Sequence, residues 1–288
     1  MSARTYETRV SSLEAVQIIG HQRPVTVIGE RINPTGRSAL VGSLQEGDLS
    51  LVLQEACAQV KAGAHILDVN LGVPGADQEA LMAAAVPALQ QAVEVPLCLD
   101  SADPRVLEAG LRAYRGKALV NSVTGEGYRL VNVLPLVREH RAAVVGLLMD
   151  DSGIPETAEA RFAVAEHIVA RAAAEGISLD DIILDPLVLA IGADPGAGRV
   201  TLETIRLVRE RLGVNVTLGV SNVSHGLPAR PALNGAFVAM AIAAGATCPI
   251  VNPLDTRMME TLRAADLCLG RDAWAAAWIR AFRAGGST

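Results

Sequence analysis

The chain has 288 residues, half of them hydrophobic but only 3% aromatic, and a formal net charge of −6. An acidic balance without a block of Lys and Arg argues against nucleic acid as a partner. The sequence shows neither the charged-then-apolar start of a signal peptide nor an apolar run of about 18 residues. We therefore expect a cytoplasmic protein that does not enter a membrane.

The four cysteines are far apart in the sequence and form no CxxC pair: Cys57, Cys98, Cys248 and Cys268. We interpret them as buried thiols of a protein in a reducing compartment rather than as metal ligands. The five histidines also lack zinc-ligand spacing. The sequence therefore predicts no protein-bound metal.

Predicted strands and helices alternate along the chain from residue 25 onward. The first strand is 25–30, and the strand–helix alternation then continues as helix 47–63, strand 64–70, helix 77–92, strand 95–100, helix 104–114, strand 117–121, helix 127–140, strand 142–150, helix 155–176, strand 181–185, helix 202–213, strand 214–222, helix 230–245, strand 248–252 and a helical tail at 257–284. The clearest helix start is Asp103 followed by Pro104, because Asp caps free N–H groups and Pro suits the first turn. Eight strand–helix pairs predict a (β/α)8 TIM barrel.

A doubly wound α/β sheet is the alternative fold, but no GxGxxG follows the first strand. No linker, low-complexity tract or internal repeat divides the chain, so we expect one barrel domain at residues 25–288. Residues 1–24 form an N-terminal extension. Within and beside it, VQII (16–19) and VTVI (25–28) flank GHQRP and are candidates for a hairpin at the barrel bottom.

Short apolar runs that each end in a polar side chain are the most informative pattern in this sequence. Runs of this length are typical of buried parallel strands, whose carboxyl ends form the active-site mouth of a TIM barrel. A carboxylate or amide is costly to bury without a partner, so the convergence of several predicts a polar pocket. These ends are Glu30 with Asn33, Asp68 with Asn70, Asp100, Asn121, Asp185, Asn222 and Asn252.

Asp100, Asn121 and Asp185 together match the hydrogen-bonding edge of a 2-amino-4-oxopyrimidine. Carboxylates can accept from its amino group and ring N–H, and an Asn amide can both donate and accept. The alternative is that these side chains cap helices or start loops. Asp103 is the better cap candidate after its strand, which leaves Asp100 spare, whereas an Asp-Pro pair at Asp185 is a common loop start.

Seven motifs occur in a characteristic order and spacing: GERINPTG (29–36), LDVNLG (67–72), LCLDS (97–101), VNSVTGE (120–126), GLLMDDSGIP (146–155), DPL (185–187) and LGVSNVSHGLPARPALN (218–234). Together they resemble the methyltetrahydrofolate:corrinoid protein methyltransferases, which are pterin-binding barrels. The resemblance covers about residues 25–285. It extends to the folate-binding module of cobalamin-dependent methionine synthase and, more distantly, to dihydropteroate synthase.

The resemblance implies roles for eight residues. Asp100, Asn121 and Asp185 match positions that hold the pterin ring, and Asn222 matches the Asn that bonds near N5 of the folate and helps stabilise the transition state. The remaining residues that match positions at or beside the pterin site are Asp68, Asn70, His225 and Arg230. His225 departs from the better-known members, which carry Gln at this position.

The implied reaction moves a methyl group, in either direction, between N5 of tetrahydrofolate and the cobalt of a corrinoid. A single barrel has no room for a corrinoid domain, so we expect the corrinoid (cobalamin) on a partner protein. The resemblance also implies a homodimer, for which the Ala-rich helix 231–244 offers an apolar face unless that face packs on the barrel.

Two other functions compete with the methyltransferase. Dihydropteroate synthase typically carries a basic stretch after the seventh strand, where this chain reads SNVSHG (221–226). A folate-binding protein without turnover would not need Asn222.

Overall fold

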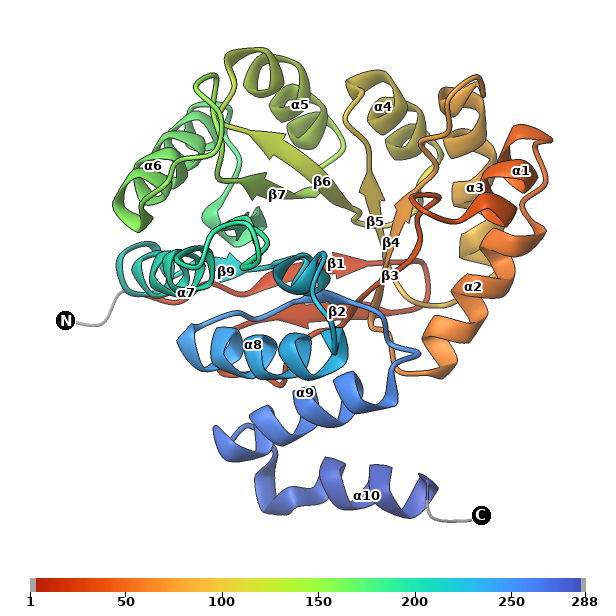
Figure 1. The fold of residues 1–288 in the computed structure, drawn as a ribbon. Helices are drawn as coiled ribbons and strands as arrows, with labels where there is room; N and C mark the ends of the chain where they lie inside the picture. The colour runs from red at the N-terminus through yellow and green to blue at the C-terminus, as the bar shows by residue number, and fades with distance from the viewer. Residues whose placement is uncertain (1–3, 286–288) are drawn as a thin grey trace.

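Residues 4–285, described here in a computed structural model, contain a ring of eight parallel strands. Figure 1 shows the strands surrounded by helices. The order around the ring is β10 (Ile250–Val251), β3 (Ile28–Ile32), β4 (Ile66–Asn70), β5 (Leu97–Asp100), β6 (Leu119–Thr124), β7 (Ala143–Leu147), β8 (Ile182–Asp185) and β9 (Asn215–Val216). The ring closes beyond β9, where Gly219 bridges to Ile250 in parallel and the Ile250 amide donates to the Leu218 carbonyl at 2.9 Å. The predicted TIM barrel is confirmed.

Helices follow the strands on the outside of the ring, and α10 lies outside α9 (Figure 1). Their bounds are α1 (Ser38–Gln45), α2 (Ser50–Lys61), α3 (Gln78–Ala92), α4 (Pro104–Ala113), α5 (Gly127–Glu139), α6 (Ala158–Ala174), α7 (Ala197–Leu207), α8 (Arg230–Ala244), α9 (Thr256–Cys268) and α10 (Ala276–Gly285). The short helix α1 was not expected from the sequence. Among the described residues, no helix is both long enough and apolar enough to cross a membrane.

Side-chain caps fix where several helices begin. Asp103 accepts a hydrogen bond from the Arg105 amide at 2.9 Å and Pro104 follows it, as the sequence predicts. Asp77 and Asp255 cap α3 and α9 in the same way. Each cap of this kind stabilises its helix by about 1 kcal/mol. Since Asp103 caps α4, the neighbouring Asp100 is left for another role.

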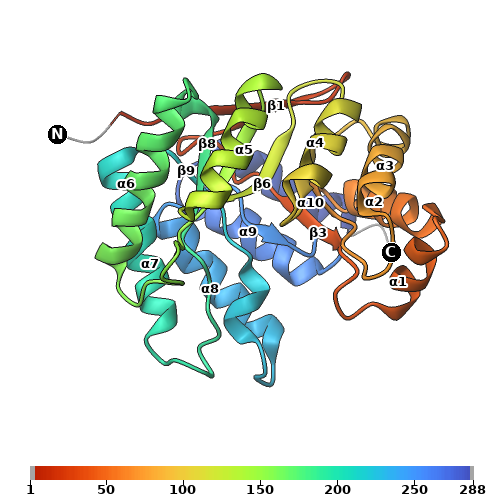
Figure 2. The same cartoon turned by 90° about the horizontal axis from the view of Figure 1, so that it is seen from above.

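A two-stranded antiparallel hairpin lies across the end of the barrel where the strands begin (Figure 2). Its strands are β1 (Thr8–Ser11) and β2 (Val16–Ile19). Val10 and Ile19 are fully buried among the inward-facing side chains of the barrel. Asn215, at the start of β9, donates to the Thr8 hydroxyl at 2.9 Å and to the Ile19 carbonyl at 3.1 Å. These contacts fasten the hairpin to the barrel.

The pairing of this hairpin differs from our expectation. VQII (16–19) pairs with residues 8–11 rather than with VTVI (25–28). The reason is that residues 25–28 enter the barrel, where the amides of Thr26 and Ile28 donate to the carbonyls of Thr247 and Pro249. The division between residues 1–24 and 25–288 stays a prediction.

The core is aliphatic, and it contains only two of the four cysteines. Cys98 and Cys248 are buried in the barrel interior, whereas Cys57 and Cys268 are exposed. The expectation of four buried thiols is therefore wrong for Cys57 and Cys268. Cys57 lies on the outward side of α2, and Cys268 lies in the last turn of α9.

Candidate functional site

Three neighbouring strands bring four of the predicted site residues into one hydrogen-bonded network at the barrel mouth. In the parallel register Asn70 lies beside Asp100, and Asp100 lies beside Asn121. The Asn70 amide donates to Asp100 Oδ2 at 2.9 Å, and the Asn121 amide donates to Asp68 Oδ1 at 3.1 Å. We call Asp68, Asn70, Asp100 and Asn121 the polar quartet.

Both carboxyl groups of the polar quartet have raised pKa values. Burial and the neighbouring Asp100 carboxylate raise the pKa of Asp68 well above its usual range. Burial also raises the pKa of Asp100, against the effect of its hydrogen bond from Asn70 and the positive charge of Arg129. Perturbed carboxyl groups gathered in a mouth are typical of a functional site.

Arg129 supports this part of the mouth from behind. This side chain on α5 is 8% exposed, and its guanidinium donates to the carbonyls of Ser101, Ala102 and Ser122. It therefore ties the loop after β5 to the end of β6. Sequence reasoning did not single out Arg129, because an Arg in a helix is usually a solvated surface residue.

Asp185 lies at the end of β8 and is 8% exposed. Burial raises its pKa to about 7, although a hydrogen bond from the Leu187 amide and the positive charge of Arg161 act in the opposite direction. The Leu187 amide donates to Asp185 Oδ1 at 2.8 Å. Asp185 thus stabilises the start of the loop after β8, which was the alternative interpretation of this Asp-Pro pair. Its raised pKa is also typical of a site residue.

Arg161 fastens the loop that follows Asp185. The side chain is 1% exposed on α6, and it donates to the carbonyls of Pro155 at 2.9 Å, Pro186 at 2.6 Å and Leu187 at 2.7 Å. The same guanidinium is the positive charge that acts on Asp185. Sequence reasoning missed Arg161 for the same reason as Arg129.

Asn222 lies in a turn and not at the end of a long strand. Of the predicted strand 214–222, only β9 (Asn215–Val216) forms a strand. The exposed Asn222 lies in a 3-10 turn, η3 (Val220–Ser224). A Cβ at Gly219 would lie 3.2 Å from Asn222 Nδ2, so glycine at this position leaves room for the Asn222 amide.

His225 directly follows this turn and Arg230 begins α8, and both are exposed. The His225 amide donates to the Asn222 carbonyl at 3.1 Å. Arg230 donates to the Ser224 hydroxyl at 3.1 Å and to the Ser221 carbonyl at 2.9 Å. In this structure both residues therefore shape the turn that presents Asn222.

Glu30 is a further candidate that the sequence marked as a strand end but that we did not assign to the site. It lies in β3 and lines a small cavity together with Ser221, Asn234 and Asn252. Burial raises the pKa of Glu30 to about 7, while the positive charges of Arg31 and Arg230 lower it. A carboxyl group that can hold a proton at neutral pH thus lies beside the turn that carries Asn222.

Residues 29–252 match the sequence profile of a family described as pterin binding enzyme. The chain belongs to the pterin-binding enzyme family. All eight residues that we predicted for the site lie within the matched segment.

Relatives of this pterin-binding enzyme include two kinds of protein. It is 32% identical over 266 residues to a methylcorrinoid:tetrahydrofolate methyltransferase of Eubacterium limosum, covering 90% of this chain and 96% of the relative. It is 34% identical over 261 residues to a methionine synthase of Mycobacterium tuberculosis, covering 86% of this chain but 22% of the relative. The chain thus corresponds to one part of the methionine synthase.

Solved structures of dihydropteroate synthases share the fold of this pterin-binding enzyme. The enzyme of Yersinia pestis bound to a pterine-sulfa conjugate has a TM-score of 0.69 at 18% identity, covering 91% of this chain and all of that structure. The enzyme of Xanthomonas albilineans with 4-aminobenzoic acid has a TM-score of 0.67 at 20% identity, covering 92% and 99%. At these identities the likeness concerns the fold alone.

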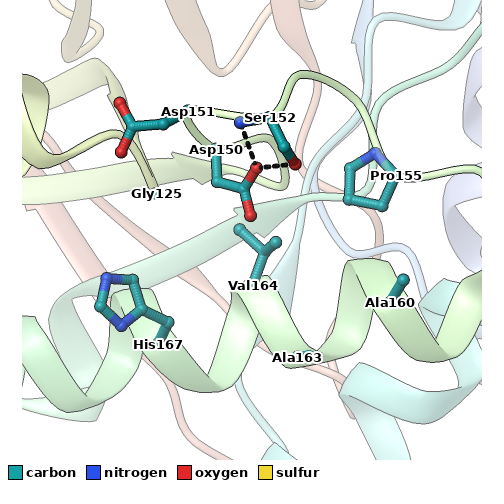
Figure 3. A pocket seen from close by; sticks show the side chains of 9 residues that line it. All are labelled: Gly125, Asp150, Asp151, Ser152, Pro155, Ala160, Ala163, Val164 and His167. Carbon is teal, nitrogen blue, oxygen red and sulfur yellow. Dashed lines mark hydrogen bonds between the residues drawn. The ribbon is translucent and has the colours of Figure 1, made fainter.

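A separate cavity of about 570 Å³ lies between the β7–α6 loop and α6 in this pterin-binding enzyme (Figure 3). Asp150 accepts hydrogen bonds from the Ser152 amide at 2.9 Å and the Ser152 hydroxyl at 2.5 Å, and both lower its pKa. Asp151 accepts from the Gly127 amide at 3.2 Å. These bonds fix the loop after β7 beside the start of α5.

Proposed function

We propose that this enzyme transfers a methyl group between N5 of tetrahydrofolate and a corrinoid carried by a partner protein. The observation that carries the proposal is the polar quartet, at the mouth of a barrel that matches a methylcorrinoid:tetrahydrofolate methyltransferase over 96% of that relative's length. The likeness to methionine synthase, limited to one part of that protein, supports the same chemistry.

In this proposal Asp100, Asn121 and Asp185 hold the pterin ring. The Asn121 amide donates to Asp68, so the carbonyl oxygen of Asn121 can accept from the ligand. The carboxylates of Asp100 and Asp185 accept hydrogen bonds from the 2-amino group and the ring N–H of the pterin. Asn70 orients Asp100 through its 2.9 Å hydrogen bond.

N5 of the folate, from which the methyl group leaves, needs a hydrogen bond or a proton in the transition state. A tertiary amine is a poor leaving group unless it is protonated or strongly hydrogen-bonded in the transition state. Asn222 supplies that hydrogen bond, and Glu30, whose pKa is about 7, can hold the proton nearby. The corrinoid cofactor of the partner supplies the cobalt that accepts or donates the methyl group. Because the turn with Asn222 is exposed, a cofactor held by a partner can approach it.

Dihydropteroate synthase is less well supported. After β9 this chain reads SNVSHG, and the next basic residue, Arg230, is engaged with Ser221 and Ser224. This segment therefore offers no Lys to bind a pyrophosphate, and its Arg is held by the two serines.

One spectroscopic experiment tests the proposal. Reduced free cobalamin is mixed with methyltetrahydrofolate, with and without the protein, and the cob(I)alamin absorbance is followed. We expect the band to disappear only when the protein is present. Folate binding without loss of the band would indicate a binding protein, and condensation of a pterin pyrophosphate with 4-aminobenzoate would indicate a synthase.

Substitution of Asp100 or Asp185 by Ala should weaken folate binding, because each change removes an acceptor for a buried N–H. The loss of such a charge-assisted hydrogen bond is worth about 1.5–3 kcal/mol, or roughly 10- to 150-fold in Kd. Calorimetric titration with methyltetrahydrofolate measures it. Glu166→Ala removes an exposed carboxylate on α6 and is the control. Unchanged affinity in both folded site variants would place the pterin elsewhere.

The corrinoid partner should dock over the barrel mouth, because the proposed folate contacts all lie there. A crosslinking map between the two proteins should place contacts on the loops after Asn121, Met149 and Asn222. The loop after Met149 includes the acidic Asp150 and Asp151. Crosslinks confined to the β1–β2 hairpin would contradict the proposal, because cobalt would then be at the opposite end of the barrel.

We also propose a cytoplasmic homodimer. Much of the apolar side of α8 packs on the barrel, where Phe237 and Val238 are buried. Met240 remains half exposed beside an apolar groove between α7 and α8. This groove is the part of α8 that supports the proposal of a dimer.

A further inference from the structure

Asp68 lies deeper in the barrel than the other members of the polar quartet. It precedes Asn70 by two residues on β4, so both side chains face the barrel interior, with Asp68 one layer further from the mouth. Asp68 is 5% exposed, whereas Asn70, Asp100 and Asn121 are only partly buried. A ligand in the mouth therefore meets Asp100 and Asn121 before it meets Asp68.

The Asp68 carboxyl group contacts both of those side chains. It accepts from the Asn121 amide at 3.1 Å, and it hydrogen-bonds to the Asp100 carboxyl group. The other titratable groups that face this pair are Cys98 on β5, with Cys248 behind it, and Arg129 on α5. Arg129 donates to backbone carbonyls, and no Lys or Arg among the described residues hydrogen-bonds to either carboxyl group.

Two buried carboxyl groups in contact cannot both ionise without a cation between them. Burial and the charge of Asp100 raise the pKa of Asp68 well above its usual range. Asp68 is the more deeply buried of the two, whereas Asp100 lies nearer the mouth and accepts from the Asn70 amide at 2.9 Å, which favours its charged form. The shared proton therefore resides on Asp68, and the carboxylate of Asp100 is the acceptor. A neutral carboxylic acid can donate one hydrogen bond and accept another at the same time.

We propose that Asp68 is a positioning residue that acts as a neutral acid, donating to Asp100 and accepting from Asn121, and so fixes the two side chains that grip the pterin. This inference rests on the proposed folate site. It differs from a direct role of Asp68 in binding, in which its negative charge would contact the pterin.

The two roles predict opposite results for Asp68→Asn. Asn has the same shape as a neutral Asp, with an N–H₂ that can donate to Asp100 and a carbonyl that can accept from Asn121. We expect Asp68→Asn to bind methyltetrahydrofolate within about 3-fold of wild type at neutral pH, and Asp68→Ala to bind at least about 10-fold more weakly. Equally weak binding by both variants would overturn the proposal. Thermal unfolding of each variant verifies that it is folded.

The pH dependence of folate binding distinguishes this role from a merely structural one, which would leave the dependence unchanged. In the wild type, raising the pH far enough to remove the proton from Asp68 should weaken folate binding, because the donor to Asp100 is lost. Asp68→Asn cannot lose this donor, so its affinity should persist on the alkaline side. Identical alkaline profiles for the two proteins would contradict the inference, even if Asp68→Ala does not fold.

An infrared measurement tests the neutral acid without any ligand. The difference spectrum of wild type minus Asp68→Asn at neutral pH should contain the C=O band of a protonated carboxyl group, and a carboxylate band in its place would overturn the inference. Failure of the proposed function would give a different result. Asp68→Asn would still bind folate nearly as well as wild type and Asp68→Ala would bind it weakly, but the wild type would transfer no methyl group to cobalamin.

Discussion

Asn222→Ala is expected to slow methyl transfer by about 10²- to 10³-fold, the usual effect of removing one preorganised hydrogen bond to a transition state. Folate binding should weaken much less, because the hydrogen bond near N5 is strongest when the methyl group is leaving. Stopped-flow loss of the cob(I)alamin band gives the rate, and calorimetry gives the affinity.

Asn132→Ala is the control for Asn222→Ala. Asn132 is an exposed Asn on α5, outside the proposed site, and its side-chain amide donates to the Tyr128 carbonyl of the same helix at 2.8 Å. A rate loss in Asn222→Ala no larger than its loss of affinity would reduce Asn222 to a simple binding residue.

Arg161→Met should lower the free energy of unfolding by about 3–5 kcal/mol. The change removes hydrogen bonds to the carbonyls of Pro155, Pro186 and Leu187. Thr201 still donates to the Leu187 carbonyl at 3.0 Å, so the carbonyls of Pro155 and Pro186 lose their donor, at about 1–3 kcal/mol each. Urea unfolding measures the loss. The change also removes the positive charge of Arg161, which lowers the pKa of Asp185. The pKa of Asp185 should therefore rise further, and folate binding at neutral pH should weaken.

Arg199→Met is the control for Arg161→Met. Arg199 is exposed on α7, and its ion pair with Glu203 at 3.6 Å spans one helical turn on the surface. Exposed pairs of this kind contribute less than about 1 kcal/mol. If both Arg variants lost the same small amount of stability, the carbonyls around Arg161 would have to be satisfied by water.

The barrel could be predicted from the sequence because the parallel strands are short apolar runs, most of which have a polar residue at or directly after their carboxyl end. The same regularity predicted the site in outline, since parallel strands bring their carboxyl ends to one mouth. Asp68, Asn70, Asp100 and Asn121 do meet there. The hairpin partner of VQII could not be predicted, because the barrel and the hairpin compete for residues 25–28 and only tertiary contacts decide between them.

The supporting residues were missed for a different reason. Arg129 and Arg161 occupy positions in helices where an Arg normally faces water, and nothing local distinguishes them. Their partners are carbonyls in loops far along the chain, such as Ala102 and Pro186, so their function depends on contacts that sequence patterns do not contain. The turn that carries Asn222 was read as strand because GVSN continues an apolar run.

The hairpin at the start of the strands has a consequence for the order of events in catalysis. On the proposed function the folate and the partner protein both use the opposite end of the barrel, and the folate occupies the inner part of that entrance. A docked partner then blocks the path by which the folate beneath it dissociates. On the proposed function, spent folate leaves only after the partner has gone, so the residence time of the protein–protein complex limits how quickly one folate is exchanged for the next.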